Sequence, residues 1–137
     1  TIMCDHCGGP LGICPDAGKR EESVAKWQKD VTQFAVCPNV VAKLGGIVMP
    51  INGFGLHKGE QPPSSDAIVA ATGRYHDFAI EVFGPERCMF ESNFPVDKQS
   101  CSYHVLWNAF KKIAKKHTQA DQQWLFHDTA SRAYRLN

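Results

Sequence analysis

Three short, continuous apolar runs divide the chain into segments. They lie at residues 1–5, 40–44 and 87–90. Each run is followed by glycine or by polar residues, which is typical of buried strands that end in turns. The pattern therefore predicts three short strands.

Longer stretches with helical spacing separate and follow these strands. Their apolar residues recur at steps of three and four, which places them on one face of a helix. The predicted helices cover residues 21–34, 66–83 and the stripe from Tyr103 to Ala114, and a terminal helical region follows Thr118. Because strands alternate with helices, the order indicates βαβ units and a parallel sheet.

Composition and charge exclude several classes of partner. The 137 residues include 15 Lys and Arg and 14 Asp and Glu, a net charge of +1, without the basic excess of a nucleic-acid interface. No apolar run approaches the roughly 20 residues of a membrane span, and no signal peptide precedes the first strand. We therefore expect one cytoplasmic α/β domain over residues 1–137, which binds neither nucleic acid nor membrane.

The six cysteines raise the question of a metal site. Cys4, His6, Cys7 and Cys14 superficially resemble a zinc knuckle, but a structural zinc site usually takes two paired clusters of ligands. The other three cysteines are far apart in the sequence and supply no second pair. Buried free thiols are the main expectation, and a non-catalytic zinc-binding or interaction module is an alternative.

Polar side chains follow each predicted strand. In β/α folds, functional residues gather at the carboxyl ends of the strands and in the loops that follow them. A histidine there can act as metal ligand, general base or electrophile, or can simply pack in the core. A carboxylate there can act as acid or base, or pair with a neighbouring Lys or Arg. After the first strand this rule selects Asp5, His6 and Cys7, and after the second Lys43 with Asn52 and His57 in the loop; after the third it selects Glu91, Ser92, Asn93, Asp97 and Lys98. From this set we keep six as site residues: His6, Lys43, His57, Glu91, Asn93 and Asp97.

Three segments resemble motifs of the amidohydrolase-2 family, in the order that the family has them. DHCGGPL at 5–11 resembles DHxGGP after the fifth barrel strand, and NVVAKLGG at 39–46 resembles NVxxKLSG of the next strand. FGPERCMFESNFP at 83–95 resembles FGxxRxMFGSDWP of the last strand. The resemblance implies the C-terminal portion of a (β/α)8 TIM barrel, with about three or four βα units and therefore an incomplete barrel.

The resemblance also implies roles for individual residues. The family's histidine after the fifth strand lines the active site, which makes His6 a catalytic residue and a ligand if a metal is bound. Asn93 replaces the family's last-strand aspartate, and Glu91 stands where the family usually has glycine. Asparagine cannot accept a proton from water. Either Asn93 orients substrate or water, or Glu91 supplies the missing carboxylate, or the activity is not hydrolysis. The substrate-binding residues expected beside them are Lys43, His57 and Asp97.

The family contains hydrolases related to sugar-lactone lactonases, with decarboxylases as cousins. We therefore expect a hydrolase that acts on a lactone or related cyclic ester or carboxylate, with a decarboxylase as alternative and a divalent metal such as zinc as cofactor of a full-length protein. The family's first-strand His-x-His pair is absent, and Thr1 stands where a natural chain has Met. We thus expect a fragment that is inactive alone and self-associates through open sheet edges.

Overall fold

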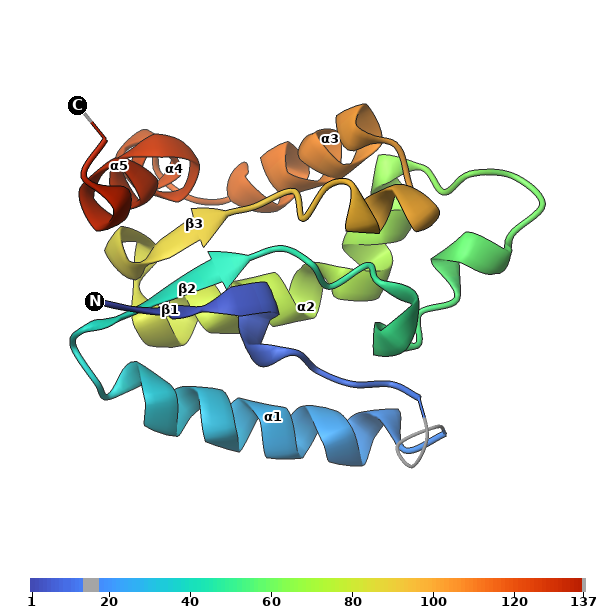
Figure 1. The fold of residues 1–137 in the computed structure, drawn as a ribbon, viewed down its shortest axis with the longest axis horizontal. Coiled ribbons are helices and arrows are strands. Elements are labelled where there is room, and N and C mark those ends of the chain that lie inside the picture. The colour runs from blue at the N-terminus through green and yellow to red at the C-terminus, as the bar shows by residue number, and fades with distance from the viewer. Residues whose placement is uncertain (14–17, 137) are drawn as a thin grey trace.

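The computed structural model describes residues 1–13 and 18–136 and contains a three-stranded parallel sheet. All three strands run in the same direction, with their carboxyl ends toward the right in Figure 1, and both chain ends lie at the left. Polar residues after the three strands therefore share one edge of the sheet. In spatial order the strands are β1 (Ile2–Cys4), β2 (Val40–Leu44) and β3 (Cys88–Phe90).

Helices connect and follow the strands, as the apolar spacing predicts. Ser64 caps the second helix by accepting a hydrogen bond from the Ala67 N–H, and Thr118 forms a capping box with Asp121. One π-helical turn, Trp124–Asp128, joins the last two helices. The helices are α1 (Arg20–Ala35), α2 (Ser65–Phe83), α3 (Tyr103–Ala114), α4 (Gln119–Gln123) and α5 (Thr129–Tyr134).

The core lies between the sheet and the helices that pack on it. Leu44 of β2 and Cys88 of β3 are fully buried. Trp27 of α1 contacts Tyr75 of α2 edge to face, with 5.1 Å between ring centroids. Helix α2 contacts both α1 and α3 and lies between them (Figure 1). Successive βα units thus repeat side by side, which is the arrangement of a barrel wall.

The sheet does not close within the part of the chain that the structure describes. There, β1 and β3 each pair with β2 and with no other strand, so the outer edge of each is open. Ile2 of β1 is 49% exposed at one of these edges. The incomplete barrel matches the expectation from the sequence, and self-association through the open edges stays a prediction.

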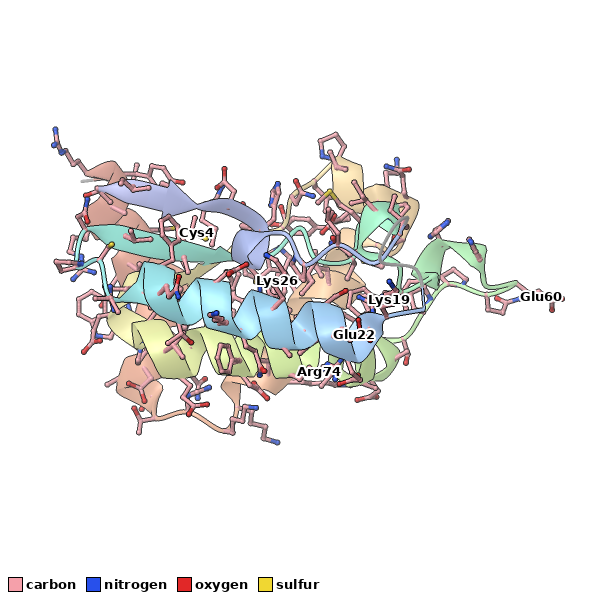
Figure 2. The ribbon with its side chains drawn as sticks, turned by 90° about the horizontal axis from the view of Figure 1, so that it is seen from below. Cys4, Lys19, Glu22, Lys26, Glu60 and Arg74 are labelled. Atoms are coloured by element: carbon pink, nitrogen blue, oxygen red, sulfur yellow. The ribbon has the colours of Figure 1, made fainter. Side chains whose placement is uncertain are left out.

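The segment after β2 is the longest connection near the strand ends. It runs over residues 45–64 and contains two short 3-10 turns, Pro50–Asn52 and Leu56–Lys58. Figure 2 shows Glu60 near the tip of this loop, beyond the rest of the molecule. None of the helices over residues 1–13 and 18–136 is long and apolar enough to cross a membrane.

Candidate functional site

The carboxyl ends of the three strands bring together four charged or titratable side chains. Nδ1 of His6 lies 2.7 Å from Oε1 of Glu91, and Nζ of Lys43 lies 2.6 Å from Oε2 of the same carboxylate. Nζ of Lys43 also lies 2.9 Å from Oδ1 of Asp5. Glu91 therefore binds a different partner with each oxygen. We call Asp5, His6, Lys43 and Glu91 the charged cluster.

Partial burial strengthens the interactions within the charged cluster. The Glu91 side chain is 13% exposed and that of Lys43 is 21% exposed, so water screens their contact incompletely. Burial alone lowers the pKa of Lys43, but its hydrogen bonds to Glu91 and Asp5 outweigh that effect and raise the pKa above its usual value. Lys43 is therefore a cation that holds Glu91 in place.

The backbone presents His6 in an uncommon conformation. His6 has φ of 55° and Cys7 has φ of 53°, both in the left-handed region that costs a residue with a side chain roughly 1–2 kcal/mol. Nε1 of Trp27 donates a 2.7 Å hydrogen bond to the Cys7 carbonyl, and the Gly9 N–H donates to the His6 carbonyl. These bonds hold the turn, and such local strain is common at functional sites.

Two glycines after β2 allow the charged cluster to form. A Cβ on Gly46 would lie 2.2 Å from Nδ1 of His6, and a Cβ on Gly45 would lie 2.0 Å from the Glu91 carbonyl oxygen. Gly46 also has φ of +65°, which favours glycine. From the sequence, these glycines indicate only the end of a strand. In the structure, the absence of a side chain at Gly45 and Gly46 leaves the space that Glu91 and His6 occupy.

A second pair, Asn93 and Asp97, lies beside the charged cluster. Nδ2 of Asn93 donates a 2.8 Å hydrogen bond to Oδ1 of Asp97, whose side chain is completely buried. Burial raises the pKa of Asp97 to about 6, although the Asn93 hydrogen bond and the charge of His6 act to lower it. Asn93 has φ of 51°, so this strand end, like that of β1, adopts the left-handed conformation.

The structure thus assembles five of the six residues selected from the sequence. His6, Lys43 and Glu91 belong to the charged cluster, and Asn93 pairs with Asp97 next to it. The sixth is His57, which is exposed in the loop after β2; among the described residues no side-chain hydrogen bond or ion pair joins it to the cluster. Its predicted contact with substrate stays a prediction, as do the roles of the other five.

Asp5 is the member of the cluster that the sequence places at a strand end but to which it assigns no role. The signal was present, since Asp5 follows the first strand and Lys43 is the last residue but one of the second. Parallel pairing sets Cys4 opposite Ala42, which brings the next residue of each strand within reach of the other.

The alternative zinc site finds no support in the described part of the chain. No group of three His, Cys, Asp or Glu side chains is placed there to hold a metal ion, and Cys14 lies outside the described residues. Burial raises the pKa of Cys4 and of Cys7, so in this structure both are buried, protonated thiols. His6 alone stays a candidate ligand, because Nδ1 is engaged by Glu91 and Nε2 has no hydrogen bond to a described residue.

A cavity of about 690 Å³ lies apart from these residues, between α1 and the turn after β1. It is lined by apolar groups such as Trp27 and Phe34 together with Cys4, which Figure 2 shows beside α1. None of the six selected residues lines it. The cavity borders the open edge of β1 and is not the candidate site.

Comparison with known proteins identifies relatives over the whole chain. Residues 1–136 match the profile of the amidohydrolase-2 family. Protein y4mH of Sinorhizobium fredii is 39% identical over 110 residues, which cover 80% of this chain and 33% of that protein. L-fucono-1,5-lactonase of Burkholderia multivorans is 27% identical over 137 residues, which cover 98% of this chain and 43% of the lactonase.

Solved structures of amidohydrolases are similar to this chain in fold as well. Two crystal structures of an amidohydrolase from Burkholderia multivorans, one with bound HEPES and one with bound zinc, superpose with TM-scores of 0.82 and 0.79 at 26% and 28% identity. They match 98% and 97% of this chain but 44% and 43% of their own, so the chain spans less than half the length of these TIM-barrel relatives. The chain belongs to the amidohydrolase-2 family and forms an unclosed portion of the family's TIM barrel.

Proposed function

We propose that this chain carries part of the active site of a hydrolase that opens a lactone or a related cyclic ester by attack of water on the carbonyl. The observation that carries the proposal is the 2.7 Å contact between Nδ1 of His6 and Oε1 of Glu91. Support also comes from the family and from similarity to a protein named as a lactonase.

The contact with Glu91 orients His6 for proton transfer. A carboxylate at Nδ1 keeps the proton of the neutral imidazole on that nitrogen, which leaves the lone pair of Nε2 available to a ligand. The His6 side chain is 33% exposed, so a water molecule can reach it. When Nε2 takes a proton, the negative charge of Glu91 stabilises the imidazolium, and Lys43 keeps Glu91 in position.

The proposed reaction balances with these residues alone. The oxygen of water forms a bond to the carbonyl carbon, and Nε2 of His6 takes the proton that this water releases. The bond between the carbonyl carbon and the ring oxygen then breaks, and His6 returns the proton to that oxygen. Asn93 cannot act as a base, but its Oδ1 can orient the water because its Nδ2 is held by Asp97.

Neither a decarboxylase nor a zinc-binding module has comparable support. No contact among the described residues favours a decarboxylase over a hydrolase, and no group of three or more His, Cys, Asp or Glu side chains there could hold a zinc ion. We therefore propose the hydrolase.

A substrate panel tests this function. The natural protein that contains these residues is incubated with γ- and δ-lactones of sugar acids, a linear ester, and a hydroxylated aromatic acid. Proton release reports ring opening, and carbon dioxide release reports decarboxylation. We expect proton release with at least one lactone above the spontaneous rate, and its loss in His6→Asn. Carbon dioxide release without ring opening would overturn the proposal.

A further inference from the structure

Asp97 is a buried acid that takes no direct part in the proposed reaction. Asp97 is 0% exposed, so its carboxyl group cannot touch a substrate from the surface. Oδ1 accepts the hydrogen bond from Asn93. Within residues 1–13 and 18–136, Oδ2 has no partner in hydrogen-bonding geometry, although the Gly46 N–H lies close enough to the carboxyl group to favour its ionised form. A buried oxygen without a partner is uncommon and asks for an explanation.

The groups around Asp97 come from every strand end. The charge of His6 after β1 favours ionisation of Asp97, and so does the backbone N–H of Gly46 after β2. The charge of Glu91 after β3 opposes it. The Cys101 thiol lies on the following turn, where its Sγ is 4.0 Å from the Asp97 carbonyl. The charges of the cluster therefore influence the ionisation of Asp97, although Asp97 makes no ion pair with the cluster.

Asn93 is the side chain through which Asp97 can act on the site. An asparagine amide has a donating end and an accepting end, and rotation by half a turn exchanges them. An ionised carboxylate only accepts, whereas a protonated carboxyl group can also donate. The protonation state of Asp97 thus dictates which end of Asn93 faces Asp97.

We propose that Asp97 is a positioning residue that determines which end of the Asn93 amide faces the substrate. When Asp97 is ionised, it binds Nδ2 of Asn93, and the Asn93 carbonyl faces outward as an acceptor for water or a hydroxyl group. When Asp97 is protonated, its O–H donates to Oδ1 of the rotated amide, and Nδ2 faces outward as a donor to a carbonyl or carboxylate oxygen.

The change between the two orientations of the Asn93 amide is expected near neutral pH. Burial raises the pKa of Asp97 to about 6, so both forms occur within the range in which most proteins stay folded. The inference rests on the proposed function only in that the acceptor form of Asn93 is the one suited to orient the attacking water. The coupling of the two side chains holds whatever the reaction is.

Side-chain NMR of the 137-residue chain tests the coupling directly. The carboxyl ¹³C resonance of Asp97 and the side-chain amide resonances of Asn93 are followed from pH 4.5 to pH 8. We expect both to change with the same midpoint, and the change at Asn93 to disappear in Asp97→Asn. Asn39, an exposed residue just before β2, serves as control and should show no such midpoint. A titration of Asp97 that leaves Asn93 unchanged would overturn the proposal.

A second variant covers the case in which Asp97→Asn does not fold. Asn93→Ala removes a hydrogen bond that lowers the pKa of Asp97, so the Asp97 midpoint should move to higher pH. An unchanged midpoint would contradict the coupling. Neither readout depends on catalysis, so failure of the lactone panel and failure of this inference are separate results.

Discussion

Nδ1 of His6 and Oε1 of Glu91 lie 2.7 Å apart although 85 positions separate the two residues in the sequence. The contact crosses the end of β2, where Gly46 has no side chain to obstruct it. The same Oε1 atom lies 3.3 Å from the backbone nitrogen of His6, so Glu91 holds both the ring and the main chain of this residue.

Glu91→Gln should release the His6 ring. The glutamine keeps the shape of the side chain but removes the charge that holds the proton on Nδ1 and that binds Lys43. In wild type, long-range ¹H–¹⁵N spectra at high pH should show the tautomer protonated on Nδ1, and in the variant a mixture of both tautomers. Glu60→Gln, at the loop tip in Figure 2, is the matched control. A wild-type His6 protonated on Nε2 would contradict this account.

Gly46→Ala should destabilise the fold and displace His6. The new methyl group would lie 2.2 Å from Nδ1 of His6 and would also require φ of +65°. We expect the free energy of unfolding in urea to fall by more than about 2 kcal/mol. Gly55→Ala is the control, because Gly55 has φ of +69° but no atom within 4 Å of its added Cβ. It should show only the conformational cost, about 1 kcal/mol. Equal losses in the two variants would mean that the contact with His6 has no effect.

Asp97 should make the protein less stable as pH rises through about 6. Burial raises its pKa to about 6 in the folded state, above the value of about 3.9 for an unfolded chain. Between these values the folded state holds more protons, so this contribution is fully present below about pH 4 and is lost as pH rises. The loss amounts to at most about 3 kcal/mol by pH 7.

The variant Asp97→Asn isolates this contribution. Urea unfolding of wild type and variant is compared at pH 4.5 and pH 7, where other titrating groups contribute equally to both proteins. Substitution should cost less stability at pH 7 than at pH 4.5. A cost that is independent of pH, or larger at pH 7, would show that Asp97 is not a buried acid of raised pKa.

The five cysteines that the structure describes should divide into one reactive thiol and four protected ones. Cys37 is exposed, whereas the other cysteines that the structure describes are buried, and burial raises the pKa of Cys101 to about 11. Iodoacetamide at pH 7.5 should modify Cys37 at least about tenfold faster than Cys101 and the remaining buried thiols. Mass spectrometry after brief labelling measures this, with urea-unfolded protein as control. Stoichiometric zinc that protects Cys4 and Cys7 would instead favour the metal-binding alternative.

Much of the fold follows from the sequence because its signals are local. The second strand, 40–44, has the predicted bounds, since Pro38 and Asn39 precede it and Gly45 follows it. The helix over 65–83 begins where Ser64 caps it and ends before Gly84. Each of these boundaries is set by residues within one turn of it, so spacing and capping are sufficient to find it.

The candidate site follows from the sequence only in part because its geometry is not local. The rule that functional residues lie at the carboxyl ends of the strands identifies His6 and Glu91 but gives no distance between them. That distance depends on the register of both strands with β2 and on the space left by Gly46. Likewise, Asp97 is identified as polar and near a strand end, but its complete burial depends on how the segment after Phe94 folds back.

The rate of lactone opening in His6 and Glu91 variants tests the central claim most directly. In the natural protein that contains these residues, kcat/KM for the best lactone is compared among wild type, His6→Asn, Glu91→Gln and His104→Asn, an exposed histidine on α3. We expect losses of about 10²-fold or more for His6→Asn and about 10- to 100-fold for Glu91→Gln, with His104→Asn unchanged. Wild-type activity in both His6→Asn and Glu91→Gln would contradict the proposed site.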